Sequence, residues 1–162
     1  MNAVLRRWNR LQPMTRAHLD EVMAIEVEAY PFPWTRGNFI DSLASGYPAR
    51  VLFDGGRRDH VIGYFVAMEG VDEMHLLNLT VAPSEQGFGH GRAMLDALLS
   101  MCRELNLPQL WLEVRVSNVR PREIYRRYGF REVGVRRAYY PAADGLREDA
   151  CVMSLDLSGG HL

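Results

Sequence analysis

The spacing of apolar residues predicts the strands and helices of the first part of the chain, because strands alternate with a period of two and helices repeat every 3.6 residues. Residues 10–14 read as a short edge strand. Apolar residues then recur with the 3.6-residue period of a helix over residues 16–30. A shorter helix is predicted over residues 35–46. The apolar positions of the first helix are Leu19, Val22, Met23, Val27 and Tyr30.

Capping residues mark where these two helices begin and end. Thr15 and Thr35 each precede a helical pattern, and threonine oxygens accept hydrogen bonds from the first-turn amides. Pro31 stops the first helix because proline lacks the amide that the helix needs. Gly46 ends the second, since glycine is favoured just after a helix.

Short strand patterns follow at residues 49–53, 60–68 and 73–81. The short connections between them favour antiparallel hairpins. Gly63 lies inside the second of these strands, and a glycine there indicates a β-bulge or a close backbone approach.

The second part of the chain begins with a strand–helix–strand unit. An amphipathic helix is predicted at residues 91–105, and an apolar strand follows at 110–116. Such a unit implies a parallel, right-handed crossover between residues 76–81 and 110–116. A helix at residues 119–128 and two strands at 131–138 and 149–157 complete the chain.

These elements predict a single mixed α/β (α+β) domain over residues 1–162. We expect a central sheet of about six to seven strands flanked by about four helices. Residues 1–9 are interpreted as a possible flexible extension and residues 158–162 as a frayed tail. Loops near residues 81–91 and 116–119 follow strand carboxyl ends, where open α/β sheets bind ligands.

Composition narrows the class of protein without changing this picture. The chain is 48% hydrophobic and 24% charged with a net charge of -1, so we expect no direct binding to nucleic acid. No apolar run approaches the roughly 20 residues that span a bilayer, and the N-terminus lacks a signal-peptide core. We therefore expect a cytoplasmic protein with no membrane partner.

The residue inventory excludes several mechanisms. All 19 basic residues are arginine, which removes lysine Schiff bases and P-loop lysines. Cys102 and Cys151 stand on apolar stripes and are interpreted as buried thiols. The histidines are scattered without metal-ligand spacing, so no metal site is expected. They are His18, His60, His75, His90 and His161.

A glycine-rich turn lies between the strand at 73–81 and the next helix. Gly87, Gly89 and Gly91 let the backbone adopt positive φ and approach a ligand closely. The turn opens a helix, whose first amides have no internal partner and attract phosphate. We favour phosphate binding over a plain connecting turn, although the spacing Gln-x-x-Gly-x-Gly matches neither the P-loop nor the dinucleotide fingerprint.

Glu113 is the polar exception within an otherwise buried strand. Alternation places it on one face with Trp111 and Arg115, while the apolar residues occupy the other face. A partly desolvated carboxylate beside Trp111 is a candidate general base. The alternative is a structural ion pair, with Arg115 or across the sheet, and the residues alone favour neither interpretation.

Asn118 and Tyr125 follow that strand. Asn118 is interpreted first as a helix cap and second as a ligand contact. Tyr125 can donate a proton to a thiolate leaving group, but a core aromatic is the commoner role for such a residue.

Charge is unevenly distributed. Residues 115–137 hold eight arginines against two glutamates, and residues 17–48 hold five acidic residues against Arg36. The basic segment could meet phosphates and the acidic one could attract a cationic peptide. Solvated helix faces remain an equal alternative for both.

Together these motifs resemble the GCN5-related N-acetyltransferase (GNAT) superfamily, and more narrowly its RimI-type ribosomal-protein-alanine N-acetyltransferases. The resemblance is carried by Phe32-Pro33-Trp34-Thr35, by Asn78 through Arg92, by Leu110 to Asn118, and by Tyr125 to Phe130 with Arg136 to Pro141 and Glu148-Asp149-Ala150. It implies a GNAT fold, in which the glycine-rich turn after the third main strand binds pyrophosphate.

The resemblance also implies roles for individual residues. Glu113 would be the general base for the substrate amine, and Tyr125 would protonate the departing CoA thiolate. Acetyl-CoA would be the co-substrate, and the acetyl group would pass directly to the amine. The implied cofactor-binding residues are Leu79, Thr80, Val81, Gln86, Gly87, Phe88, Gly89, His90, Gly91, Arg92, Asn118 and Tyr125.

The implied acceptor is a protein N-terminus, in particular that of an alanine-starting small-subunit ribosomal protein. An α-amino group has a pKa of about 8, so modest help from a base suffices near neutral pH. Two other functions remain open from the sequence: acetylation of a small-molecule amine, and a non-catalytic module that binds acyl-CoA.

Overall fold

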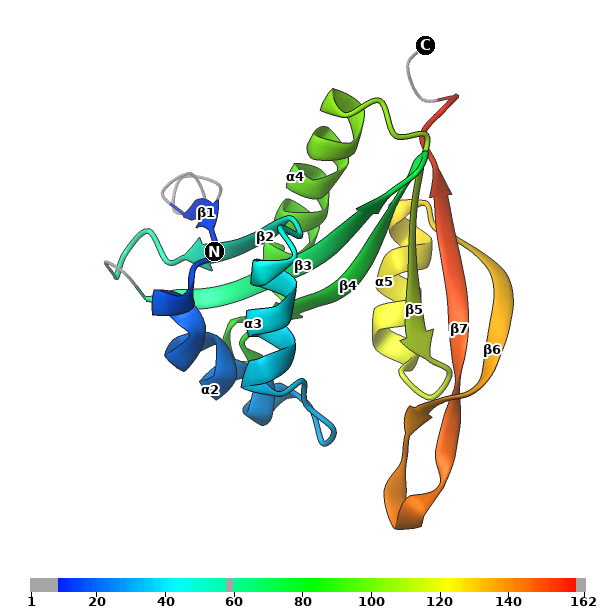
Figure 1. Cartoon of the computed structure of the whole chain (residues 1–162), viewed down its shortest axis with the longest axis horizontal. Helices are drawn as coiled ribbons and strands as arrows, with labels where there is room; N and C mark the ends of the chain where they lie inside the picture. Colours follow the sequence, from blue (N-terminus) through cyan, green and yellow to red (C-terminus); the bar gives the residue numbers. More distant parts are fainter. Residues whose placement is uncertain (1–8, 58–59, 160–162) are drawn as a thin grey trace. The chain divides into compact units, whose positions relative to one another are not determined.

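The computed structural model describes residues 9–57 and 60–159, and Figure 1 traces the chain. The predicted extension and tail therefore lie mostly outside the described residues. Four α-helices and seven strands of the described part follow one another in the predicted order. They are β1 Arg10–Pro13, α2 Leu19–Ala29, α3 Arg36–Ala44, β2 Ala49–Phe53, β3 Val61–Gly70, β4 Glu73–Val81, α4 His90–Glu104, β5 Gln109–Arg115, α5 Val119–Tyr128, β6 Arg131–Pro141 and β7 Arg147–Asp156.

The seven strands form one mixed sheet in the order β1-β2-β3-β4-β5-β7-β6. β4 and β5 are parallel, with Met74 opposite Leu110 and Leu76 opposite Leu112. The pairs β2–β3 and β5–β7 are antiparallel. A parallel pair requires a crossover connection, which α4 supplies. The predicted mixed sheet and the parallel pairing are confirmed, although the paired residues are 74–76 with 110–112 rather than 76–81 with 110–116. The predicted right-handedness of the crossover stays a prediction.

The chain forms two compact units. Among the described residues, the first unit comprises those up to Met68 together with Asn78–Leu98, and the second comprises Glu69–Leu77 together with those from Leu99 onward. β4 and α4 each contribute residues to both units. The expectation of a single domain stays a prediction.

In the first unit, helices cover both faces of β3. The Tyr64 hydroxyl donates to Glu26 on α2, and the Tyr64 ring meets Phe39 on α3. The backbone of Gly63, the preceding residue, faces Met94 on α4. Since neighbouring strand residues face opposite sides of a sheet, α2 and α3 cover one face and α4 the other.

The helix predicted at residues 16–30 differs from the pattern in two details. Its first turn, Arg16–His18, is a 3-10 helix, and there the Thr15 amide donates to His18 Nδ1 at 2.9 Å. Val27, predicted on the apolar stripe, is 56% exposed, whereas Glu26 is buried. The reason is tertiary, because Glu26 has polar partners within the unit that satisfy its carboxylate.

Both expectations for Gly63 are confirmed. The register of β2 against β3 shifts between Leu52 and Phe53, which leaves an irregularity next to Gly63. A Cβ at this position would lie 2.9 Å from the carbonyl oxygen of Thr80. The glycine therefore allows β3 and β4 to approach closely.

Substitution of Gly63 by alanine is expected to lower the free energy of unfolding by about 1–3 kcal/mol, because backbone must move to accept the new methyl group. Chemical denaturation monitored by circular dichroism measures this loss. Gly134→Ala is the matched control, since a Cβ there would meet no atom within 4 Å. Equal stability of the two variants would contradict the close approach.

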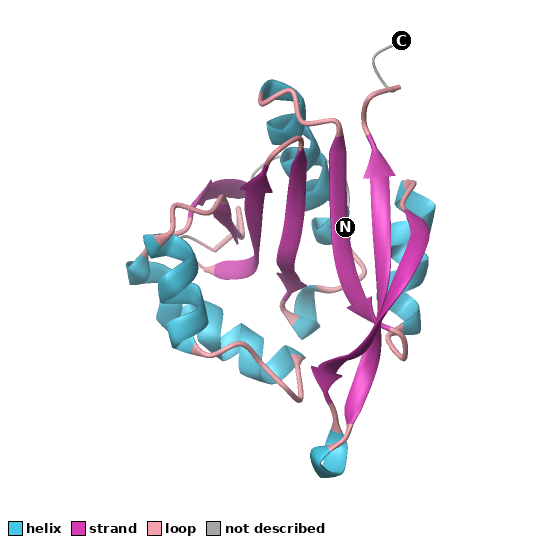
Figure 2. Cartoon of the chain, turned by 45° about the vertical axis from the view of Figure 1, so that its right-hand side comes forward, coloured by secondary structure: helices cyan, strands magenta, loops and turns pink. Residues whose placement is uncertain are grey.

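The second unit contains β5, β6, β7 and α5 (Figure 2). Leu112 and Val114 of β5 are buried and lie opposite Met153 and Cys151 of β7. At the end of α5, the backbone of Gly129 faces the side chain of Leu155, whose position in the register places it on this same face. α5 therefore covers the apolar face of β5 and β7, and the face of Trp111 and Glu113 is the opposite one.

Candidate active site

The first unit holds the glycine-rich turn. A 3-10 turn, Pro83–Glu85, is followed by Gly87 and Gly89 with φ of 87° and 86°. The Ala93 amide donates to the Gly89 carbonyl at 3.0 Å as α4 begins. The amides of residues 90–92 thus belong to the first helical turn, where an i−4 carbonyl is lacking. Positive φ is confirmed for two of the three glycines.

Gly91 is the exception. It lies within α4, and positive φ is found at Gly87 and Gly89 rather than there. A Cβ at Gly91 would lie 3.9 Å from the side chains of Leu79 and Val81, which is ordinary contact. The space between the start of α4 and the end of β4 would therefore accept a Cβ at this position without a clash.

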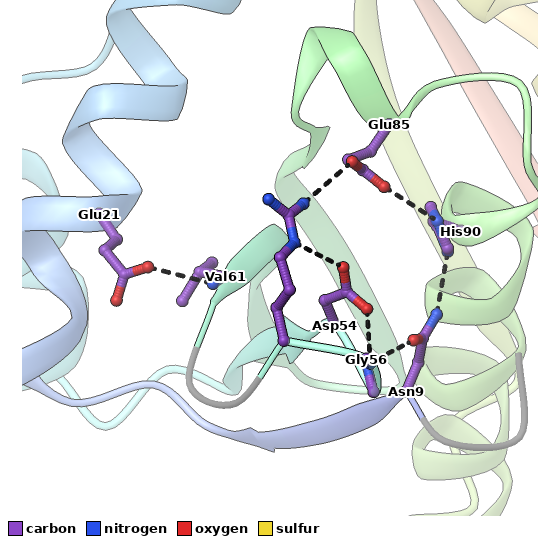
Figure 3. A network of polar contacts seen from close by, with 9 residues as sticks. Asn9, Glu21, Asp54, Gly56, Val61, Glu85 and His90 are labelled. Carbon is purple, nitrogen blue, oxygen red and sulfur yellow. Dashed lines mark hydrogen bonds and ion pairs between the residues drawn. The ribbon is translucent and has the colours of Figure 1, made fainter. Parts of the chain in front are cut away.

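Polar and charged side chains contact Glu85 and His90 of the turn (Figure 3). Glu85 lies between Arg57, at 3.6 Å, and His90, at 3.9 Å. Asn9 Nδ2 lies 3.4 Å from His90 Nδ1, and its Oδ1 accepts from the Gly55 amide. The side chain of His90 is buried among these contacts. A role for His90 in ligand binding would therefore come from its backbone amide.

The exposed residues of the turn include Gln86, Gly87, Phe88 and Gly89. Gln86 Nε2 donates to the carbonyl of Val81 at 3.1 Å, which ties the turn back to the end of β4. Arg92, in the first turn of α4, is also exposed.

Buried polar contacts fix the end of β4 within the first unit. Thr80 Oγ1 lies 2.7 Å from the Tyr30 hydroxyl and donates to Asn78 Oδ1 at 2.7 Å. Asn78 Nδ2 in turn donates to Glu26 at 3.1 Å, and burial raises the pKa of Tyr30 to about 12. The Thr80 side chain is thus buried and hydrogen-bonded within the unit, whereas Leu79 and Val81 are partly exposed.

Glu113 in the second unit has two polar partners. Its Oε1 lies 2.6 Å from His75 Nε2, and its Oε2 lies 2.9 Å from Arg136 Nε. The Glu113 side chain is only 6% exposed. Partial desolvation, expected from the strand pattern, is therefore present, and a cross-strand ion pair is present with it.

Of the two ion pairs that the sequence left open for Glu113, the structure forms the one across the sheet, with Arg136. Arg115 instead donates to the carbonyl of Pro141 at 2.7 Å and to Glu148 at 3.2 Å. Glu148 also accepts from the Ser117 amide, and its pKa lies below the usual range mainly because of its hydrogen bonds to Ser117. These contacts join the end of β5 to the β6–β7 hairpin and leave Glu113 to other partners.

Asn118 precedes α5, but its side chain makes no capping hydrogen bond. Asn118 thus occupies the predicted N-cap position, and only the side-chain hydrogen bond expected of a cap is lacking. Tyr125 is partly exposed on α5, and its ring centroid lies 5.5 Å from that of Phe130. It is accordingly not a fully buried core aromatic.

Most arginines of the basic segment, residues 115–137, form ion pairs. The pairs are Arg115–Glu148, Arg122–Glu132, Arg126–Glu132, Arg126–Glu123, Arg127–Glu123 and Arg136–Glu113. Several are well exposed, and exposed pairs contribute little to stability. On α5 the arrangement favours a solvated, ion-paired helix face over a phosphate-binding surface.

Cys102 and Cys151 are buried free thiols, as predicted. Burial raises the pKa of Cys102 to about 11, which disfavours the reactive thiolate. Across residues 9–57 and 60–159, no three His, Cys, Asp or Glu side chains form a group suited to a metal ion. Nor does any helix in those two ranges combine the length and apolar character of a membrane span.

Two partners of Glu113 were missed by sequence reasoning. In the sequence, His75 stands out only as one of five scattered histidines. Arg136 stands out only as a member of a basic segment and of the stretch Arg136 to Pro141 that carries the family resemblance. The register of β4 against β5 pairs His75 with Trp111, two residues before Glu113. A histidine inside an apolar strand expected to pair in parallel with the Glu113 strand was the available signal.

Comparisons with known proteins agree with this architecture. The acetyltransferase (GNAT) family profile matches residues 19–130. The ribosomal protein bS18-alanine N-acetyltransferase of Escherichia coli K12 is 34% identical over 150 residues, covering 93% of this chain and 99% of that protein. The same enzyme of Haemophilus ducreyi is 30% identical over 147 residues, covering 91% and 99%.

Solved structures extend the likeness. The crystal structure of the Escherichia coli ribosomal-protein-S18-alanine N-acetyltransferase has a TM-score of 0.82 at 33% identity and covers 95% of this chain and 98% of that one. Arabidopsis thaliana Naa50, bound to a bisubstrate analogue, has a TM-score of 0.76 at 18% identity over 91% and 98%, a likeness of fold alone. The chain therefore belongs to the GNAT family, whose members are acetyl-CoA-dependent N-acetyltransferases.

Proposed function

We propose that this protein acetylates the N-terminal α-amino group of a protein, in particular an alanine-starting small-subunit ribosomal protein of the bS18 type. The observation that carries the proposal is the similarity, over nearly the full length of both chains, to enzymes named for that reaction. The carboxylate of Glu113, which is buried and contacts both His75 and Arg136, supports the proposal, because an α-ammonium group must lose a proton before it attacks.

The first unit is suited to hold a diphosphate. Its turn carries two positive-φ glycines, and the first-turn amides of α4 follow directly. Such amides bind phosphate without a basic side chain. In this proposal residues 86–92 bind the diphosphate of acetyl-CoA, the backbone of Leu79 to Val81 binds its pantetheine arm, and Asn118 makes a further contact.

Bound acetyl-CoA supplies the acetyl group and a thiolate as leaving group. Glu113 accepts a proton from the substrate α-ammonium, directly or through one water, and so frees the nitrogen lone pair. The nitrogen–carbon bond to the acetyl carbonyl forms as the carbon–sulfur bond breaks. The Tyr125 hydroxyl gives its proton to the departing sulfur, and the second proton of the acetylated nitrogen passes through solvent to the resulting Tyr125 phenolate. Glu113 then releases its proton to solvent, so both side chains are restored without a covalent enzyme intermediate.

Mass spectrometry of peptides tests the acceptor. A peptide with the free alanine N-terminus of bS18 is expected to gain one acetyl group when incubated with the protein and acetyl-CoA. The matched control is the same peptide with its N-terminus blocked by formylation, which is expected to gain none.

Three other outcomes would contradict the proposal. Gain on the blocked peptide would place acetylation on a side chain. Gain on a polyamine or an amine antibiotic, with none on the peptide, would indicate a small-molecule acetyltransferase. Stabilisation of the protein by CoA with no transfer to any amine would indicate a non-catalytic acyl-CoA-binding module.

A further inference from the structure

His75, Trp111, Glu113 and Arg136 form a connected cluster in the second unit, together with Glu73. The cluster draws on three strands, β4, β5 and β6. Glu113 has a proposed chemical role, but the other members have none. The cluster therefore raises the question of what its histidine does.

The contact between His75 and Glu113 has a defined direction. As the proposed general base, Glu113 must be ionised before the reaction, and an ionised carboxylate only accepts hydrogen bonds, so the 2.6 Å contact then requires a proton on His75 Nε2. A hydrogen bond to a charged acceptor is stronger than one between neutral groups. The His75 side chain is 10% exposed, against 50% for Arg136 on the other carboxylate oxygen. His75 is thus the buried anchor of Glu113 and Arg136 the exposed one.

The orientation of the His75 ring is itself fixed. It stacks on Trp111 with ring centroids 3.7 Å apart and an interplanar angle of 11°. The Trp111 indole N–H donates to the Glu73 carboxylate, which holds the indole ring in place. The guanidinium carbon of Arg136 lies 5.7 Å from the centroid of the same indole ring. A histidine stacked in this way presents its Nε2 proton to Glu113 in one direction.

A general base requires this kind of support. The terminal torsion of a glutamate is broad, so an unsupported carboxylate samples many orientations. Proton transfer depends on the position of the accepting oxygen. Each carboxylate oxygen has two lone-pair sites, so His75 and Arg136 leave one site on each oxygen for an incoming proton.

We infer that His75 is a positioning residue for the acetyl-transfer reaction, which holds Glu113 through Nε2 in the orientation that accepts the proton of the substrate amine. This inference rests on the proposed function, because it gives His75 a role only through Glu113. His75 itself is not assigned any contact with substrate or acetyl-CoA.

Two amide substitutions of His75 separate the hydrogen bond from the ring. In His75→Gln the side-chain amide nitrogen is as many bonds from Cβ as the imidazole Nε2, so it can still donate to Glu113. In His75→Asn the same amide is one carbon shorter and cannot reach. His75→Phe keeps an aromatic ring for Trp111 but has no donor.

The kinetic constants of the full-length variants are the measurement. We expect kcat for the alanine-starting peptide to fall about tenfold or more in His75→Asn and His75→Phe, with the KM for acetyl-CoA unchanged. His75→Gln is expected to stay within about threefold of the wild type. Thermal melts of each variant identify any loss of folding. Equal impairment of the Gln and Asn variants, or a wild-type kcat in the Phe variant, would overturn the inference.

A double-mutant cycle with Glu113→Gln tests whether His75 acts through Glu113. If it does, His75→Phe produces no further loss of kcat in the Glu113→Gln background. A purely structural residue would cause the same fold loss in both backgrounds, and that result would also refute the inference. Full activity of Glu113→Gln alone would instead refute the proposed base. An impaired Glu113→Gln with wild-type activity in every His75 variant would refute only the role of His75.

Discussion

Replacement of Glu113 by glutamine is expected to lower kcat for acetylation of an alanine-starting peptide by about 100-fold or more. Glutamine has nearly the shape of glutamate and can still accept from His75 Nε2, but it takes no proton from an ammonium group. Because the substitution leaves the turn of the first unit unchanged, the affinity for acetyl-CoA is expected to stay the same. Steady-state assays of released CoA thiol and calorimetric titration measure the two quantities.

A matched control separates the base from a general effect of lost charge. Glu104 is exposed at the end of α4, and Glu104→Gln removes the same charge from the same unit. This variant is expected to keep wild-type kcat. A Glu113→Gln enzyme with kcat near that of the control would show that the base lies elsewhere or that the amine arrives already neutral.

Replacement of Tyr125 by phenylalanine is expected to lower kcat by roughly tenfold to a hundredfold while the dissociation constant for CoA changes by less than about twofold. The substitution removes only the hydroxyl, and the ring beside Phe130 is retained. A proton donor to the leaving thiolate acts in the transition state, so its loss appears in turnover rather than in binding.

Tyr128→Phe is the control for Tyr125. Tyr128 lies on the same helix, and its ring centroid is 6.2 Å from that of Phe130. Its hydroxyl is expected to be dispensable for turnover. Should Tyr125→Phe weaken CoA binding without changing kcat, Tyr125 would be a packing residue and the proton donor would be another group.

Glu113 and Tyr125 come from opposite sides of the sheet in the second unit. Glu113 projects from the face that bears Trp111, whereas α5 covers the face that bears Leu155. In the proposed reaction both groups must still reach one acetyl carbon, because the amine nitrogen bonds to that carbon as the sulfur leaves it.

The local pattern predicted β5 well because alternation is a property of the strand itself. The burial of Leu110, Leu112 and Val114 follows from a period of two, whatever the strand pairs with. The identity of the partners of Glu113 does not follow, since His75 and Arg136 lie 38 and 23 positions away along the chain. Only strand order and register bring them to the same carboxylate.

The α2 stripe illustrates a second limit. Helical periodicity favours Val27 as a core residue, since it is apolar, and disfavours Glu26. The structure reverses both because Tyr64 and Asn78 come from the sheet to satisfy the Glu26 carboxylate. A buried polar group is tolerated when its hydrogen bonds are made, and those partners are not visible in a local window.

The sequence by itself determined the order of strands and helices, the two faces of β5, the need for glycine at Gly63 and Gly87, and the family resemblance, because each depends on short-range backbone preference or on local motifs. The tertiary structure alone decided which charges meet. In it, Glu113 contacts His75 and Arg136, and Arg115 pairs with Glu148. The side chains of Thr80 and His90 are buried in polar contacts. The physical reason is that hydrogen bonds and ion pairs depend on distances of a few ångströms between side chains, which strand pairing sets and sequence spacing does not.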